Sequence, residues 1–483
     1  MSITGALSNA LSGLTATARG VETTSNNVAN ALTEGYARRE LEVAARNLGS
    51  EGQGVRVVGV RRMIDMTLVG DRRLADAGTG NRDTRAAFYQ GLADTLGDTG
   101  DGSLLARISS LSSSLVAAAS RPESTARLQN VLDAASALAR GLNQASDAVQ
   151  TARQDADSSI ASQVDQLNTT LARVKDLNAK ITEVRSVGRD ASALEDQRQT
   201  LVDSIARIVP LREVQRENGQ IALFTAGGAA LLDGRAAEFG FTAKPGIDAT
   251  DRLADGALGG LTLNGRPVRV SGETGLMAGG SLAAAFAIRD ELAPQEQARL
   301  DALARSLVDR LASPSVDPTL GVGDAGLFTD AGGALDPADE AGLAGRLSVN
   351  VLVDPSRGGD LWCLRDGLNA TSAGPSGNAT LLNAIGAALD ARLSASTGGI
   401  EGAYSLAGFA TETVSLVSSA FLSADEEASF VAARRDELHA LELGDGVDTD
   451  QELERLLRLE QAYAANAKVI TACDQLINHL LEM

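Results

Sequence analysis

One long apolar repeat constrains the fold of this chain more than any other feature. Between Thr125 and Val187, apolar residues recur at alternating steps of three and four, with two successive steps of four from Ala156 to Val164. This spacing is typical of a coiled-coil helix with a stutter, and such a helix would be about 90 Å long. The chain is therefore expected to be built around long helices. Shorter ones are predicted over 191–208, 281–312, 379–392 and 404–441.

Both ends of the chain carry a similar repeat. A terminal helix of about 30 residues cannot bury its own seam, so the two should pair with each other or with neighbouring copies, and be poorly ordered until then. Asn466 is strongly polar; a buried Asn can fix the register of a coiled coil, and a partly exposed Asn without that role fits equally well. The predicted assembly seam consists of Ile3, Leu7, Leu14, Val21 and Val28 at one end and Leu456, Leu459, Tyr463, Asn466, Ile470, Ile477 and Leu480 at the other.

Proline placement separates helical ends from a turn-rich middle. All prolines except Pro122 lie between Pro210 and Pro375, and proline interrupts helices. Strands are predicted at 209–214 and 220–225, and a hairpin at Asn264-Gly265. The predicted fold class is mainly α with a smaller β part. Its discontinuous domains are terminal coiled-coil arms (1–34 with 447–483), a long-helix rod domain or bundle (35–209 with 279–320 and 378–446), a small inserted β domain (210–278) and an irregular outer insertion (321–377).

Charge and composition exclude several classes of function. The 43 Lys and Arg face 63 Asp and Glu, giving a net charge of −20, which argues against nucleic acid and anionic membranes as partners. Cys363 and Cys473 are far apart in the sequence, so neither a disulfide framework nor a zinc knuckle is expected. The sequence predicts no membrane span and no cleavable signal peptide, because it has neither a run of about 18 apolar residues nor a leader pattern.

No catalytic, cofactor or metal motif stands out, and we expect no enzyme and no cofactor. The run 321–326 matches the dinucleotide fingerprint, but prolines precede it and no helix follows, so a surface loop is expected. Acidic residues within 317–340 lack the spacing that wraps Ca²⁺, which favours a solvated loop. His439 and His479 lie in charge-rich helical contexts that favour solvated side chains.

A cluster of Asn and Ser late in the first helix predicts a joint between arm and body. Such side chains compete for backbone hydrogen bonds and so loosen or end a helix, and a following glycine permits a turn. Two short strands are expected next, at 39–43 and 55–60. The joint motif consists of Ser25, Asn26, Asn27, Asn30, Gly35 and Tyr36.

Four segments resemble a known protein family. Residues 25–38 are similar to the N-terminal signature of bacterial flagellar axial proteins of rod, hook and hook-associated type, and 461–470 to their C-terminal signature. The stretches 193–203 and 279–290 resemble the hook-associated protein 1 family, which forms the hook–filament junction. The terminal signatures are shared by all members, so the internal stretches, the long helices and the length point to that family.

The resemblance implies a structural subunit of the bacterial flagellum that joins hook to filament. It implies an extracellular protein that is exported without a cleavable signal peptide and self-assembles into a junction layer. Its implied partners are hook protein, the second hook–filament junction protein and a flagellar export chaperone. Coupled folding of the terminal helices with neighbouring subunits is the expected mechanism. The alternatives are a hook or rod axial protein, or a flagellin-like subunit with an outer-domain carboxylate hydrolase, which would need two acids facing across a cleft in 210–375.

Overall fold

The long apolar repeat forms one continuous helix. α4 spans Thr125–Ser186, 62 residues, which corresponds to about 90 Å. Ala156, Ile160 and Val164, which form the stutter, are all buried. The irregular step therefore leaves the helix intact and its apolar side inside the core, as the repeat predicts.

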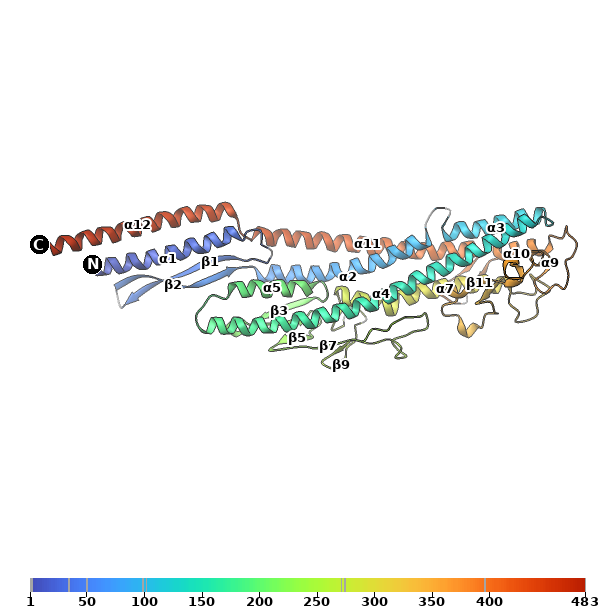
Figure 1. Cartoon of the computed structure of the whole chain (residues 1–483), viewed down its shortest axis with the longest axis horizontal. Coiled ribbons are helices and arrows are strands. Elements are labelled where there is room, and N and C mark those ends of the chain that lie inside the picture. Colours follow the sequence, from blue (N-terminus) through green and yellow to red (C-terminus); the bar gives the residue numbers. More distant parts are fainter. Residues whose placement is uncertain are drawn as a thin grey trace.

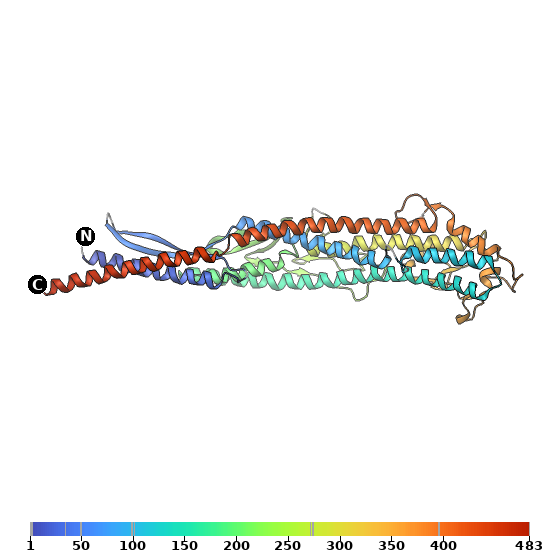
Figure 2. The same cartoon turned by 90° about the horizontal axis from the view of Figure 1, so that it is seen from above.

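The computed structural model describes residues 3–33, 35–48, 51–97, 100, 102–270, 272, 275–394 and 397–482. It is an elongated rod in which helices run side by side along α4 (Figure 1; Figure 2). One hydrophobic core extends from Phe88 to Val417 in the sequence. The other helices of this bundle are α2 (Met66–Leu96), α3 (Leu104–Ser120), α5 (Ser192–Ala206), α6 (Gly280–Ala287), α7 (Ala293–Leu311), α10 (Thr380–Asp390) and α11 (Leu406–Gly444), with a π-helical turn at Ile288–Leu292.

The sequence pattern does not separate α2 and α3 within the predicted rod domain. After Val69, α2 buries small and polar residues up to Ala86, among them Arg72 and Arg73, and only its last turns bury large apolar side chains, Phe88, Leu92 and Leu96. Hydrophobic periodicity cannot reveal a helix of that kind. The remaining predicted helices are present, with boundaries shifted by a few residues.

The β part lies along one side of the helices (Figure 1). β3 (Leu211–Gln215) and β4 (Ile221–Thr225) form the predicted hairpin, and its turn places Asn218 at φ 57°. With β5 (Ala230–Asp233) and β6 (Arg235–Ala236) they make a four-stranded antiparallel sheet. A three-stranded sheet contains β7 (Phe239–Gly240), β8 (Thr262–Leu263) and β9 (Arg266–Pro267), of which the last two form the hairpin predicted at Asn264-Gly265.

Residues 321–377, the predicted outer insertion, contain short elements that pack on the far end of the bundle. Phe328, Leu343 and Leu364 join the same core as α4 and α7. The run 321–326 is a loop, as expected. The elements are β10 (Phe328–Asp330), β11 (Leu347–Val349), α8 (Leu343–Arg346), α9 (Cys363–Asp366) and the 3-10 turns Pro337–Asp339, Val351–Val353 and Pro355–Arg357; β12 (Leu393–Ser394) and β13 (Ala403–Tyr404) follow α10.

The two chain ends form an arm at one end of the rod. α1 (Ile3–Ala29) and α12 (Thr449–Leu481) lie side by side in opposite directions, so both termini lie at the same tip (Figure 1; Figure 2). Beside α1 lies a ribbon of two antiparallel strands, β1 (Arg38–Leu48) and β2 (Glu51–Met63). The prediction of short strands is wrong in length, because two register shifts let the pairing continue over the whole ribbon.

One apolar stretch lies within the last two helices of the described chain. Within Leu406–Leu481, an 18-residue window of mean hydropathy 1.2 is long and apolar enough to cross a membrane, and 33% of it is buried. No span is predicted here from the sequence. Phe409, Val414 and Val417, near the start of α11, lie in the core of the bundle. Core packing therefore accounts for these three residues, while most of the 18-residue window is not buried.

Candidate functional site

Small residues of α1 make its contact with α12. A Cβ on Gly13 would lie 2.8 Å from Asn466 Oδ1, and one on Gly20 would lie 3.0 Å from Leu459 Cδ2. Glycine is therefore what allows this close approach of the two helices. The facing residues recur every seven positions on both helices, which makes the contact an antiparallel coiled coil. The pairs are Gly13 with Asn466, Gly20 with Leu459 and Asn27 with Glu452.

The predicted seam residues of α1 lie beside this contact. Leu14 and Val21 each follow a contact glycine by one position, which turns them about 100° around the helix axis. The ribbon lies on the other side, where Ser12 Oγ accepts a hydrogen bond from the Val55 N–H at 3.1 Å. The apolar stripe of α1 is half-buried and comprises Ile3, Leu7, Leu14, Val21 and Val28. The fully buried residues of α1 are Ala10, Ala16, Gly20, Thr24 and Asn27. Periodicity of large residues thus locates a stripe, but not the intramolecular contact.

On α12, the predicted seam faces α1 more directly. Leu459 and Asn466 face the glycines, and Cys473, one repeat further, is buried. Tyr463 and Leu480 are 43% and 61% exposed. Asn466 Nδ2 donates to Ala462 O of its own helix at 3.0 Å. The remaining seam residues, half-buried, are Leu456, Ile470 and Ile477.

Asn27 lies at the centre of the joint and is fully buried. Its Oδ1 accepts hydrogen bonds from the Tyr36 hydroxyl at 2.8 Å and from the Arg39 N–H at 2.9 Å. Its Nδ2 donates to Arg39 O at 2.8 Å and to Glu452 Oε2 at 3.1 Å. All four hydrogen-bonding positions of the carboxamide are used. One side chain thereby connects α1, the following loop, β1 and α12.

Glu452 is the buried acid of the joint, with 0% of its surface exposed. Arg38 Nε donates to its Oε1 at 2.7 Å. A carboxylate is stable inside a protein only when it is paired and hydrogen-bonded, so Asn27 and Arg38 together hold the first turn of α12. Nearer the surface, Arg455 pairs with Glu40 at 2.9 Å.

A second polar cluster fastens the ribbon to α5. Asp196 accepts hydrogen bonds from Arg39 Nη2 at 2.7 Å and from Arg62 Nε at 2.8 Å. The preceding loop packs on the same helix, because a Cβ on Gly35 would lie 2.4 Å from Thr200 Oγ1. Gly35 also has φ 76°, which favours glycine. These residues of α5 belong to the stretch 193–203 that carries the internal resemblance.

Asp203, also on α5, connects this helix to α2 of the bundle. It accepts from Arg73 Nε at 2.6 Å and pairs with Arg72 Nη2 at 2.9 Å. Burial by itself would lower the pKa of Arg72, but Asp203 and Glu442 beside it raise the pKa above its ordinary value. The guanidinium therefore stays charged and links α2, α5 and α11.

The predicted joint motif is divided between buried and exposed positions. Asn27 and Tyr36 meet in the joint, whereas Gly35 packs against Thr200 of α5. Burial raises the pKa of the Tyr36 hydroxyl. Ser25 and Asn26 are exposed. Asn30 is half-buried, and its Nδ2 donates to Asn26 O at 2.9 Å.

Sequence reasoning missed Glu452, Arg38 and Arg62. An acid in the first turn of a helix normally indicates a solvated residue that favours the helix dipole. One signal is present in the sequence: counting seven positions back from Leu459 in the seam leads to Glu452. The arginines carry no comparable signal, because alternation along a ribbon does not say which acid each side chain reaches.

The acids of 317–340 serve structural contacts. Asp317 accepts from the Leu368 N–H at 2.9 Å, and Asp330 pairs with Arg346 at 2.8 Å. Within the described ranges, no group of three or more His, Cys, Asp or Glu is placed to hold a metal ion. Cys363 and Cys473 are free thiols, and their helices α9 and α12 lie at opposite ends of the rod (Figure 1).

Comparison with known proteins identifies relatives of the whole chain and of its parts. Residues 89–313 match the flagellar hook-associated protein FlgK helical domain, residues 444–483 the flagellar basal body rod FlgEFG protein C-terminal region, and residues 7–36 the flagella basal body rod protein model. Flagellar hook-associated protein 1 of Bacillus subtilis (strain 168) is 22% identical over 98% of this chain and 97% of its own length. The solved flagellar hook junction protein FlgK from Burkholderia pseudomallei is 19% identical, with a TM-score of 0.44 over 54% of this chain and 46% of that one.

Proposed function

This chain belongs to the FlgK family of flagellar hook-associated proteins, and we propose that it is a structural subunit of the junction between hook and filament. It is part of the bacterial flagellum. The observation that supports a role in assembly is the arm, whose two helices pair through small residues and leave the apolar stripe of α1 half-exposed.

The proposed mechanism follows from the three sides of α1. One side packs on α12 and a second faces the ribbon, while Leu14, Val21 and their neighbours in the stripe lie on a third. In a layer of side-by-side copies, this stripe would be buried against the arm of the next subunit, together with Leu456 and Tyr463 of α12. Contacts between unlike surfaces generate rings or helical tubes, and burial of apolar area would drive them.

The interior is proposed to act as a rigid spacer, with no catalytic role. In this division the arms are 1–34 with 447–483, and the bundle and β part give the subunit its width. Hook protein and the second hook–filament junction protein are the proposed neighbours above and below the layer. The proposed location is extracellular, reached by export without a cleavable signal peptide.

A dedicated export chaperone is a further proposed partner. Before assembly, the apolar residues of α12, such as Leu457 at 58% exposed and Leu476 at 54%, would offer an amphipathic helix to a groove. Full-length chain should co-purify with the chaperone, and chain ending at residue 446 should not. Equal recovery of both forms would contradict capture through the C-terminal arm.

The assembly role can be tested in cells that lack this chain. We expect such cells to keep hooks and lose attached filaments, and antibody labelling of complemented cells to mark the hook–filament junction by electron microscopy. Leu14→Asp should be secreted normally but incorporated poorly, because it places a charge in the stripe. The matched control Thr15→Asp changes the adjacent, exposed position. Filaments that form normally without the chain would disprove the proposal.

A further inference from the structure

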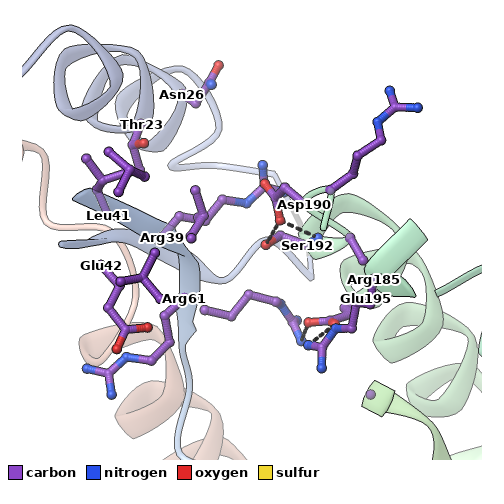
Figure 3. Close-up of a pocket in the computed structure, with 18 of the residues that line it drawn as sticks. Thr23, Asn26, Arg39, Leu41, Glu42, Arg61, Arg185, Asp190, Ser192 and Glu195 are labelled. Atoms are coloured by element: carbon purple, nitrogen blue, oxygen red, sulfur yellow. Dashed lines mark hydrogen bonds and ion pairs between the residues drawn. The ribbon is translucent and has the colours of Figure 1, made fainter. Parts of the chain in front are cut away.

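A large polar groove lies where the arm meets the body. Its volume is about 1150 Å³, and its walls are α1, the ribbon and the turn between α4 and α5. Figure 3 shows Thr23 and Asn26 of α1 on one side, Arg39 and Arg61 of the ribbon below them, and the segment Asp190–Glu195 opposite. No element of the described chain fills this space, although it adjoins the fixed contacts of Asp196.

The groove is basic in an otherwise acidic protein. Seven arginines and four carboxylates line it, whereas the whole chain has a net charge of −20. Arg39, Arg62 and Arg185 are paired with acids of α5. The guanidinium groups of Arg19, Arg61 and Arg189 form no hydrogen bond or ion pair with the described residues, and all three residues are exposed.

A surface of the opposite charge, negative, lies at the connection between α11 and α12. Asp445, Asp448 and Asp450 are exposed. Asp448 caps α12 by accepting from the N–H groups of Asp450 and Gln451. The carboxylates of Asp445 and Asp450 have no side-chain partner in the described structure. Between Arg435 and Arg455 the chain contains no lysine or arginine, so nothing on this segment neutralises them.

The α11–α12 connection and the α4–α5 turn, which is one wall of the groove, lie at one level of the rod and on opposite edges of it. In Figure 1 the α11–α12 connection is on the upper edge and the α4–α5 turn is on the lower edge, at nearly the same position along the long axis. Within one molecule, α1 and the ribbon lie between the connection and the turn. The connection and the turn would meet if a second copy stood beside the first at the same height.

We propose that the arginine groove of each subunit receives the acidic α11–α12 connection of the neighbouring subunit. This inference rests on the proposed function and names the contact that sets the height of each copy in the layer. Opposite charges at an interface guide docking and fix register. The free arginines Arg19, Arg61 and Arg189 would receive the carboxylates of Asp445 and Asp450.

The test uses flagella isolated from cells in which a cysteine variant is the only source of this chain. The double variant Arg189→Cys with Asp450→Cys should form disulfide-linked multimers under mild oxidation, seen as a ladder on non-reducing gels. Arg189→Cys with Asp255→Cys is the matched control, because Asp255 is exposed but lies in the β part. It should form no ladder.

Charge exchange gives a second, independent readout. Arg61→Asp with Arg189→Asp, and separately Asp445→Arg with Asp450→Arg, should each lower incorporation into flagella about five-fold through like-charge contacts, with secretion unchanged. Combining the four substitutions should restore incorporation. If the chain is present in flagella but gives no ladder and no rescue, the groove contact is wrong while the junction role stands. If the chain is absent from flagella, both are wrong.

Discussion

At the scale of single residues, Asn27 is central to the joint. Its carboxamide serves four hydrogen bonds, one of them to the buried Glu452. Replacing it with alanine removes the partner of Glu452 Oε2 and of the Arg39 N–H and C=O, at a cost of about 1–3 kcal/mol for such a buried group, while Arg38 still pairs with Glu452 Oε1.

We therefore expect Asn27→Ala to loosen the arm. Proteolytic cleavage within 3–33 and 449–481 should become several-fold faster, while the melting temperature of the body stays unchanged. Asn26→Ala, at an exposed position, is the control and should behave like the wild type. Equal cleavage rates for both variants would show that the joint does not depend on this side chain.

Glu296 of α7 predicts a pH dependence of stability. Its Oε1 accepts from Arg299 at 2.7 Å, and its Oε2 is buried without a partner in the described chain. Burial raises the pKa of Glu296, and Arg299 partly offsets this. The folded state therefore keeps the proton to higher pH than the unfolded chain, so the contribution of this group to stability falls as pH rises above about 4.3.

In the Glu296→Gln variant, the free energy of unfolding should fall less steeply as the pH rises above about 4.3. The measurement is the free energy of unfolding by urea at several pH values between about 5 and 8, where the difference in proton binding between the two states sets the slope. Glu291→Gln, at an exposed site of the preceding turn, is the control. A slope identical in wild type and Glu296→Gln would contradict the assignment.

At this scale the sequence predicts less than the structure shows. Asn27, Gly35 and Tyr36 stand out in the sequence because Asn and Gly have strong local preferences. Glu452 lies 425 positions from its partner Asn27, and Asp196 lies 159 positions from Ala37, from whose N–H it accepts a hydrogen bond. No local preference encodes such a distance. The family resemblance points to 193–203 without saying what Asp196 binds.

At the scale of helices and strands, the packing of the arm depends on the close approach of α1 to α12. Gly20→Leu would place a large side chain where even a Cβ would lie 3.0 Å from Leu459. Overpacking of this kind costs about 1–3 kcal/mol. We expect faster amide hydrogen exchange along α1 and α12, with exchange in α4 unchanged.

A matched glycine in another helix should respond in the opposite direction. A Cβ on Gly70 of α2 would meet no atom within 4 Å. Gly70→Ala should raise the free energy of unfolding by about 0.5–1 kcal/mol, because alanine favours the helix. A loss of stability in Gly70→Ala would show that glycine there has a packing role.

A helix or strand can be predicted from the sequence where its apolar residues follow one regular spacing or a turn motif marks its end. The sequence predicts α4 whole because a regular stripe of apolar residues runs along it, and the β3–β4 hairpin because of its Asn-Gly turn. It does not separate α2, because most of the buried side of that helix before Phe88 holds Arg72, Arg73 and small residues. In α1 the largest residues mark the half-buried stripe, since the fully buried positions hold alanine, glycine, threonine and asparagine.

At the scale of the whole molecule, the arm and the body differ in how they are held. The main hydrophobic core, within the described chain, draws its side chains from 88–417 and none from the arm. α12 buries only Glu452 and Cys473 fully. Few buried contacts imply a low free energy of local opening.

A chain reduced to 38–446 should therefore fold and keep its melting temperature within about 3 °C of the full chain. It should be secreted poorly and should not enter flagella, because both terminal segments are missing. Limited proteolysis of the full chain with mass mapping should release the same terminal pieces first. Protection of both ends equal to that of α4 would contradict the expected division.

The shared tip of the two termini has a consequence for the order of events in folding. A polypeptide is synthesised from its first residue onward, yet α1 finds its partner only in the last thirty or so positions. α1 therefore cannot pair with α12 until α12 has been synthesised. A product that stops before α12 could still form the core within 88–417 but would leave α1 unpaired, so α1 and α12 pair only in molecules that contain both helices.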